Sequence, residues 1–477
     1  MRLAKFETLS KSEMQDVHEA SLDVLENCGI VIHSQKVLAM LKENGADVDE
    51  SKELAKMNRA LVQKCIDMAP SEFTLYNRNK EEAFVVGDST PRCASGHNAI
   101  FLMDTSSSDR RYAKVSDVEA FAIVSEKMRD IDIVGVPLNP QDVPDKATLL
   151  YAVKALFENT TKPLFFSTES REVNKAIIDM MKVVAGTDDI ASCPNAICQL
   201  SPTSPLYWEP GAVEGVVDAA KNGVPLTILP EPMSGVSAPY SVAGLLTVHN
   251  TEVLSGVVIS QLINPGTPIV YGSSWTTYNM KSTAAIIASP ETNILRVAGC
   301  QMARFYGLPS HTTALNSDSN CHDEQNAWEK SLSNMAAICA DNDIVMNAGM
   351  YASGLTISLE QLVLDDEMNG LIRRLRKGVE VSRESIAAEV IKNVGPVNDY
   401  FMQEHTLENL RSGEFRESEL PLAKNYEEWI SQNAPGVELL AKRKVDDIMS
   451  KGNSKPLEEH VRQGLEHIIK KFEKEHC

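Results

Sequence analysis

Short apolar runs alternate with helical patterns from residue 131 to residue 349, and this alternation restricts the fold more than any other feature. A strand that is apolar on both faces must be covered on both sides, so such runs are typical of a parallel sheet enclosed by helices. Repetition about every 30 residues over about 240 residues predicts an α/β fold of the TIM (β/α)8 barrel type. Seven strands are expected, at Ile131–Val136, Pro163–Thr168, Ala196–Ser201, Pro225–Pro230, Pro268–Gly272, Ser310–Leu315 and Ile344–Gly349.

The segments on either side of these strands have different patterns. Residues 1–115 are expected to form an N-terminal extension of helices and β-hairpins packed on the barrel, and the barrel itself should occupy residues 116–377. The eighth strand is expected at Ala99–Met103, or within an element whose pattern does not separate it from a helix. Residues 378–477 are charged and periodic, which predicts a C-terminal extension of packed helices rather than a linker.

The charge balance restricts the partners. The 477-residue chain has 46 Lys and Arg against 66 Asp and Glu, a formal net charge of −20. Because so acidic a surface repels phosphate backbones and anionic headgroups, we expect neither nucleic acid nor a membrane as a partner. The sequence has no apolar run of about 18 residues, and its N-terminus shows no apolar signal segment. With nine scattered cysteines, these features predict a reduced, cytoplasmic protein.

Several enzyme classes have motifs that this sequence lacks. Neither G-x-x-x-x-G-K-[ST] nor G-x-G-x-x-G after a strand is present, so nucleotide binding has no support. C-x-x-C, H-E-x-x-H and G-x-S-x-G are also absent, which argues against a zinc site and against a serine nucleophile. Cys321 and His322 are adjacent, and neighbouring residues rarely bind one ion together, so no metal is expected.

Polar or glycine-rich turns follow most of the predicted strands, for example Ser201–Ser204 and Pro230–Gly235. In a barrel, the turns after the strands share one rim, and the active site lies there. A doubly wound open sheet would also bring them together, but length and strand number favour the barrel. The active site is therefore expected on this rim.

Three segments resemble the trimethylamine methyltransferase family, and they occur in the family's order. They are APYSVAGLLTVHNTEVLSG at residues 238–256 with INPGTPIVYG at 263–272, GLTISLEQLVLDDE at 354–367, and HTLENLRSG at 405–413. The resemblance implies a barrel enzyme that passes a methyl group from a methylated amine to the Co(I) of a separate corrinoid protein. It also implies that this corrinoid (cobalamin) is carried by the partner and that the chain binds no cofactor directly.

One departure from the family bears on the substrate. The trimethylamine-specific members carry pyrrolysine in the barrel, whereas this chain consists of the twenty standard amino acids. The corresponding position falls in or near Asn316–His322. The resemblance is therefore to the non-pyrrolysine branch, whose substrates are quaternary amines. Glycine betaine is the favoured substrate, with proline betaine, carnitine or another methylamine as alternatives.

A quaternary ammonium has no N–H to donate, so aromatic faces and carboxylates usually hold it. Glu169 and Glu231, which lie just past strand ends, could offset the charge. Phe165 and Phe166 alternate, so one of the two should face inward. Each aromatic candidate could instead pack a loop or a neighbouring subunit. The candidates for an aromatic cage at the rim are Phe166, Tyr207, Trp208, Tyr271, Trp275 and Tyr351.

The carboxylate of a betaine would need hydrogen-bond donors. Gln199, His311 and Asn316 qualify by position, and His97, after a glycine, could close over the barrel mouth. For His311 alone, a core histidine bonded to the backbone is the favoured interpretation. No residue is assigned to acid–base catalysis, because a quaternary amine leaves as a neutral tertiary amine. Orientation of the substrate is the expected catalytic contribution.

Two other functions stay open at this point. One is a non-catalytic barrel that binds methylated amines, since the chain lacks both pyrrolysine and an acid–base pair. The other is a different barrel enzyme, such as a lyase or isomerase that uses Glu231 and His311. In the methyltransferase interpretation, a cognate corrinoid protein docks over the barrel mouth, and the chain forms a homo-oligomer through its helical faces.

Overall fold

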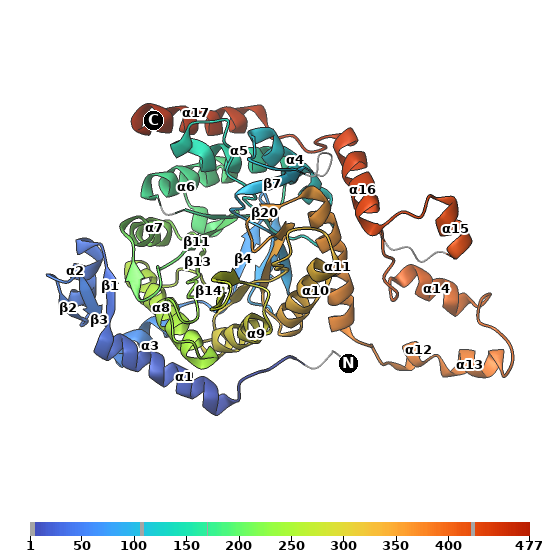
Figure 1. The fold of residues 1–477 in the computed structure, drawn as a ribbon, viewed down its shortest axis with the longest axis horizontal. Helices are drawn as coiled ribbons and strands as arrows, with labels where there is room; N and C mark the ends of the chain where they lie inside the picture. The colour runs from blue at the N-terminus through green and yellow to red at the C-terminus, as the bar shows by residue number, and fades with distance from the viewer. Residues whose placement is uncertain (1–4, 105–108, 169, 421–424) are drawn as a thin grey trace.

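Eight parallel strands close into a barrel in the computed structural model, which describes residues 5–104, 109–168, 170–420 and 425–477 (Figure 1). The strands are β6 (Arg92–Ser95), β9 (Val134–Gly135), β10 (Leu164–Ser167), β11 (Ala196–Leu200), β13 (Leu226–Ile228), β14 (Ile269–Ser273), β17 (Ser310–Thr313) and β18 (Ile344–Ala348). β6 pairs with β18, and a bridge between Ala94 and Ile133 joins it to the strand at the other end of the sheet. The predicted TIM barrel is confirmed.

A helix follows each barrel strand and lies on the outside, so the helices form a ring around the strands (Figure 1). Many of these helices begin at a serine whose side chain accepts a backbone N–H, as Ser170, Ser241, Ser289 and Ser358 do. Such caps explain why polar turns follow the strands in the sequence. The helices are α4 (Val115–Lys127), α5 (Thr148–Asn159), α6 (Arg171–Ala185), α7 (Pro210–Lys221), α8 (Val242–Ile263), α9 (Pro290–Phe305), α10 (Glu324–Cys339) and α11 (Leu359–Lys377).

The seven predicted strands are all in the barrel, but the eighth is not at Ala99–Met103. It is β6, whose sequence Arg-Cys-Ala-Ser is too polar to stand out as a buried strand. The expected segment instead contributes β7 (Phe101–Asp104), which lies in a small sheet with β8 (Asp109–Arg111), β19 (Met350–Tyr351) and β20 (Thr356–Ile357). The barrel thus begins inside the stretch 1–115 that was assigned to the N-terminal extension.

The remainder of the N-terminal stretch closes the barrel from below and from the side. Leu75 and Val86 belong to one buried cluster with Phe165, Ile344 and other inward-facing strand residues, so their hairpin plugs the amino ends of the strands. The outer elements pack on α8 and α9 (Figure 1). The bounds are α1 (Lys11–Asp23), a π-helical turn (Val24–Cys28), β1 (Ile30–Ile32), α2 (Gln35–Glu43), β2 (Asp47–Asp49), β3 (Leu54–Lys56), α3 (Arg59–Met68), β4 (Phe73–Tyr76) and β5 (Glu82–Val86).

Three short strands lie in the loops above the barrel. β12 (Tyr207–Trp208) extends the N-terminal sheet by pairing with β1, and β15 (Thr277–Asn279) pairs with β16 (Ala284–Ile286). Helix α8 has the length and hydropathy of a membrane span, but most of it is buried in the barrel wall. It is therefore a core helix, with α1, α3, α7 and α9 as neighbours.

The C-terminal extension divides into two parts. α16 (Val437–Lys451) packs on α11 and α4, and α17 (Glu459–His476) packs on α5 and α6. Between α11 and α16 the chain leaves the barrel as an extended segment that includes α12 (Arg383–Ile386), α13 (Ala388–Val394), α14 (Glu404–Ser412) and α15 (Tyr426–Ser431) (Figure 1). The expectation of packed helices is correct for α16 and α17 and wrong for α12 to α14, because most apolar side chains there face solvent.

One buried ion pair fixes the ends of β17 and β18 relative to their helices. Lys330 on α10 and Asp365 on α11 are both fully buried, with 2.9 Å between Nζ and Oδ2. Lys330 also donates to the carbonyl of Leu315, and Asp365 accepts the backbone N–H of Gly349 at 2.7 Å. Two loops of the rim are therefore held by one buried ion pair.

We predict that Lys330→Met lowers the free energy of unfolding by about 3–5 kcal/mol, because it leaves Asp365 charged and buried. Adding Asp365→Asn should restore part of this loss, since the amide oxygen can still accept the Gly349 N–H. Urea denaturation followed by circular dichroism measures both. Lys451→Met, in an exposed ion pair with Asp447, is the control and should cost less than about 1 kcal/mol. Equal losses for Lys330→Met and Lys451→Met would contradict the assignment.

Candidate functional site

A cavity of about 830 Å³ opens where the strands β10, β11 and β13 end. Polar side chains and a single carboxylate line its inner wall, and the beginnings of α5 and α6 form its outer edge. The end of α17 also borders it, through Phe472 and His476. The inner wall consists of Asn98, Asn139, Ser167, Thr168, Ser170, Gln199, Ser201 and Glu231. Its position at the carboxyl ends of barrel strands is where TIM-barrel active sites lie.

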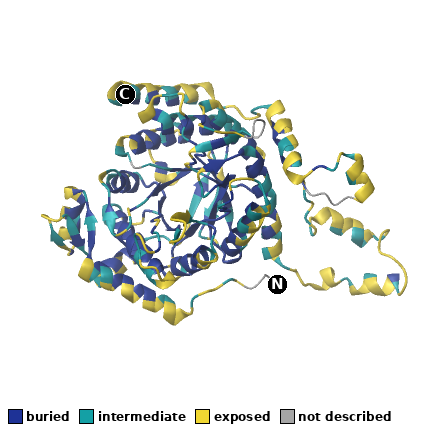
Figure 2. Cartoon of the chain, in the orientation of Figure 1, coloured by how far each residue is buried: buried dark blue, intermediate teal, exposed yellow. Residues whose placement is uncertain are grey.

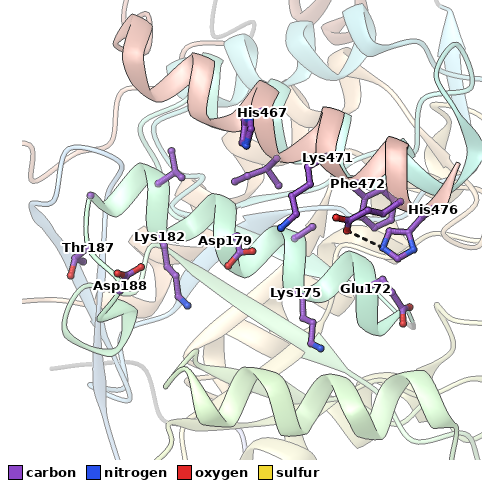
Figure 3. A pocket seen from close by; sticks show the side chains of 15 residues that line it. Glu172, Lys175, Asp179, Lys182, Thr187, Asp188, His467, Lys471, Phe472 and His476 are labelled. Carbon is purple, nitrogen blue, oxygen red and sulfur yellow. Dashed lines mark ion pairs between the residues drawn. The ribbon is translucent and has the colours of Figure 1, made fainter.

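A second hollow of similar size, about 840 Å³, lies on the outside of the barrel between α6 and α17 (Figure 3). Acidic and basic side chains are mixed along it, so no charge of one sign dominates (Figure 3). They are Glu172, Asp179, Asp188 and Glu475 with Lys175, Lys182 and Lys471. This groove does not reach the strand ends. We therefore take the barrel mouth as the candidate active site.

Glu231 is the carboxylate of the barrel mouth. It follows β13 in register with Thr227 and Leu229, so its side chain points inward, and solvent in the cavity reaches it. The protein wall around the cavity raises the pKa of Glu231, while a hydrogen bond from Ser274 opposes this shift. Ser274 in turn receives a hydrogen bond from Thr313 at 3.3 Å. Glu231 therefore offers a negative charge on the inner wall of the cavity, whereas Asp145, Lys146 and Glu172 lie at its outer edge.

Three rings meet inside the barrel beneath this carboxylate. The centroid of Phe165 lies 5.2 Å from that of His97 and 5.2 Å from that of His311, both edge to face. Burial lowers the pKa of His97 to about 4, opposed by the neighbouring Gln199. Burial, together with the charge that His97 would carry, lowers the pKa of His311 to about 3. Both imidazoles are neutral near pH 7.

Polar atoms in this inner layer lack protein partners. Within the described part of the chain, no hydrogen bond reaches Nδ1 of His97, Oε1 of Gln199, Oγ1 of Thr227 or either ring nitrogen of His311. Buried polar groups normally have a partner, and leaving one unsatisfied costs about 1–3 kcal/mol. The interpretation of His311 as a core histidine satisfied by the backbone is therefore wrong. Gln199 lines the cavity, whereas His311 and Thr227 are fully buried beneath it.

The expected aromatic cage does not form, because the candidates lie on the outward side of their strands. Phe165 faces the barrel interior and Phe166 packs among the helices. Along β14 and just past its end the inward residues are Val270, Gly272 and Ser274, which turns Tyr271 and Trp275 outward. Tyr271 donates to Asn250 of α8 at 2.9 Å. Trp275 packs against His249 of α8, with ring centroids 4.5 Å apart.

The other aromatic candidates are also away from the cavity. Tyr207 packs edge to face on His33, and Trp208 donates to Ser255 of α8, because β12 belongs to the N-terminal sheet. Tyr351 packs beside His322 at the outer rim. The cage prediction is thus wrong for all six residues. A cage requires inward side chains, and the sequence did not reveal which side of each strand faces in.

The remaining candidates divide into those inside the barrel and one that is not. His97, Gln199, Glu231 and His311 lie inside it, as described. Asn316 contacts the amide of Asn347 at 2.8 Å and lies against the buried Arg296, so it braces the rim instead of lining the cavity. Glu169 lies outside the described residues.

Sequence reasoning missed several cavity residues. Asn98 donates to Ser167 across the inner wall at 2.5 Å, and its position next to His97 was the available signal. Lys146 donates to the backbone carbonyl of His476 at 2.9 Å, which holds the end of α17 at the cavity edge. No local pattern could reveal this contact between residues 330 positions apart. Over the described ranges, no group of three His, Cys, Asp or Glu side chains could hold a metal ion.

A closed eight-stranded barrel with a polar pocket and a carboxylate at its carboxyl rim has the architecture of a TIM-barrel enzyme. The family profile described as trimethylamine methyltransferase (MTTB) matches residues 1–477. The chain therefore belongs to the trimethylamine methyltransferase family, which confirms the resemblance and the prediction of a methyltransferase.

Relatives agree with this assignment, and a solved structure agrees with the fold. The chain is 30% identical over 468 residues to trimethylamine methyltransferase MttB of Desulfitobacterium hafniense, covering 98% of this chain and 94% of the relative. It is 30% identical over 433 residues to a glycine betaine methyltransferase of the same species, covering 90% of each. The crystal structure of Methanosarcina barkeri monomethylamine methyltransferase (MtmB) is similar in fold, with a TM-score of 0.54, 13% identity, and coverage of 98% of this chain and 88% of that chain.

The low pKa of His311 predicts a specific loss of stability in acid. Unfolded histidine titrates near 6.5, so between pH 6.5 and pH 3 the unfolded chain binds a proton that the folded chain does not. This contribution is fully present above pH 6.5 and is lost as the pH falls towards 3, by about 1.4 kcal/mol per pH unit.

The variant His311→Asn should reduce the slope of unfolding free energy against pH by about that amount between pH 6 and pH 4. Urea denaturation at a series of pH values measures the slope. His460→Asn, at an exposed position of α17, is the control and should leave the slope unchanged. An unchanged slope in His311→Asn would show that His311 is protonated in the folded protein.

Proposed function

We propose that the chain transfers a methyl group from a quaternary amine, glycine betaine first, to the Co(I) of a partner corrinoid protein. Family membership supports methyl transfer from a methylated amine, and one relative over 90% of the chain is a glycine betaine methyltransferase. The chain has only standard amino acids. A donor that needs no pyrrolysine adduct therefore fits it better than trimethylamine.

Glu231 is the observation that carries the proposal. A quaternary ammonium cannot donate a hydrogen bond, so without an aromatic cage its main attraction must be to a negative charge. At 4 Å, two opposite charges attract by about 4 kcal/mol when the effective dielectric constant is about 20. Glu231 lies on the inner wall of the cavity among neutral polar side chains, and the other charged side chains lie at the outer edge, so Glu231 is the natural counter-ion for the ammonium group.

The inner layer supports a zwitterion rather than a simple cation. His97 and His311 carry unpartnered ring nitrogens below Glu231, and the N–H group of a neutral imidazole can donate to a carboxylate. A betaine would bind with its carboxylate towards these groups and its ammonium near Glu231. One N-methyl group would then point out of the barrel mouth, towards an acceptor held above it.

This arrangement supplies orientation rather than proton transfer. The leaving group is a neutral tertiary amine, so no general acid is required at the transfer step. The two imidazoles, neutral at pH 7 because burial lowers their pKa, are suited to hydrogen bonding and not to protonating the amine. Co(I), carried by the partner, is the nucleophile, and the pocket holds one methyl group in line with it.

The partner and the location follow from the same reaction. The acceptor must reach the methyl group through the open mouth, so we expect the corrinoid protein to dock over the carboxyl rim, beside the end of α17. All nine cysteines are free, which suits the reducing cytoplasm. A non-catalytic methylamine-binding barrel is the alternative to this proposal.

An absorbance assay tests the reaction. A corrinoid protein reduced with titanium(III) would be mixed with the chain and, separately, with glycine betaine, proline betaine, carnitine, choline and trimethylamine. We expect loss of the Co(I) band with glycine betaine and none without the chain. Loss with trimethylamine alone would refute the quaternary-amine assignment. Binding of betaine by calorimetry without any loss of the band would favour the binding protein.

We also predict that Glu231→Gln raises the KM for the quaternary amine by about 10- to 100-fold, or about 1.4–2.8 kcal/mol. Glu172→Gln, an exposed carboxylate at the outer edge of the same cavity, is the matched control and should change KM less than about twofold. Steady-state kinetics against the betaine measures both. Equal effects would mean that the net charge of the mouth, and not Glu231, attracts the cation.

The same counter-ion has a pH dependence. The pKa of Glu231 is raised, so its charge is lost at a higher pH than that of an ordinary glutamate, and KM should rise as the pH falls towards that range. In Glu231→Gln this acid-side rise should disappear.

A further inference from the structure

Residues 379–413, here called the arm, leave the body of the protein and bury almost nothing. Val394 is the one buried side chain among them, and all of these residues are described. Figure 2 shows the arm exposed along its length, in contrast to the ring of buried helices. The arm begins at the end of α11, next to Gly378, and the chain returns to α11 where Arg374 contacts Glu414.

The helices of the arm are too short to hold themselves. α12, α13 and α14 have 4, 7 and 9 residues, whereas an isolated helix needs about 12–15 residues to be even marginally stable in water. Helical stability in proteins comes mainly from packing an apolar face. The arm therefore needs a surface that is not supplied by its own chain.

The arm carries the side chains that such packing would bury. Phe401 and Met402 are 84% and 85% exposed. Single apolar residues scattered over a surface are normal, but adjacent exposed apolar side chains mark an interaction site. They continue into further exposed apolar residues, which include Ile386, Ile391, Val397 and Leu410. Burying these side chains would remove on the order of 1,000 Å² from each arm, which is in the range of stable protein interfaces.

The body of the same chain has an apolar strip with no partner. Trp328 and Leu332 are exposed on one face of α10, and Leu371 and Leu375 are exposed on the neighbouring face of α11. Each pair is spaced by four residues, so it forms one side of its helix. The arm leaves from the lower end of this strip, because α11 ends at Lys377.

We propose that the arm packs on the α10–α11 strip of a second copy of this chain, and that the second arm does the same in return. When a two-fold axis relates two chains, the arm of each chain contacts the strip of the other chain, so both contacts form together. The occupant must be permanent, because the arm has no fold without it. A corrinoid protein that binds and leaves in every turnover would not meet this condition, whereas a second copy does.

Solution mass tests the proposal with the full chain. Light scattering at tens of micromolar should give at least twice the 52.4 kDa of one chain. The double variant Phe401→Asp/Met402→Asp and the strip variant Leu332→Glu/Leu371→Glu should each give half the native mass. Val236→Asp, which alters an apolar residue of a rim loop that is 63% exposed, is the control and should keep the native mass. A monomeric wild-type chain, or an unchanged mass in both double variants, would overturn the proposal.

A cross-linking experiment covers the case in which the charged variants fail to fold. A photoreactive phenylalanine analogue at position 401 would be used in a mixture of unlabelled and isotopically labelled chains. We expect mixed-label cross-links from position 401 to peptides of α10 or α11. Cross-links only within one chain, or only after addition of the corrinoid protein and to that protein, would refute arm exchange. Neither test measures methyl transfer, so the proposed function can fail without affecting the proposal of arm exchange.

Discussion

Closure of the barrel is the constraint on which the rest of the structure depends. β6 joins β18 on one side and reaches the strand β9 on the other through the Ala94–Ile133 bridge. Once eight parallel strands are closed, their carboxyl ends share one rim, and every inward side chain has a fixed depth. The hairpin of Leu75 and Val86 seals the opposite end, so a ligand can enter the barrel only from the rim that carries Glu231.

The charge of the side chains that face the barrel interior changes with their depth in the barrel. Near the plug the wall is apolar, at mid-height it holds two imidazoles that burial keeps neutral, and the carboxylate of Glu231 lies at the solvated mouth. A charged group is least costly where water still reaches it, and a neutral donor is most useful where water does not. This order suits a zwitterion that enters with its anionic end first.

The C-terminal extension combines two different uses of helices. α17 packs on α5 and α6 and ends at the cavity, where Lys146 fixes its last turn. The arm, in contrast, exposes Phe401 and Met402 and has no core of its own. The first is part of the active-site wall. The second has the features of an interface between copies of the chain.

Periodicity in the sequence was sufficient to determine the barrel, seven of its strands and the position of Glu231 just past a strand end, because buried parallel strands must be apolar throughout. The same continuity hides which side faces in, so Phe165 and Phe166, or Tyr271 and Gly272, are indistinguishable until the strands pair. β6 escaped detection because Ser95 and Arg92 make it polar. Contacts such as Lys146 with His476, and the convergence of His97 with His311, arise only from closure, which brings distant residues together without leaving a local pattern.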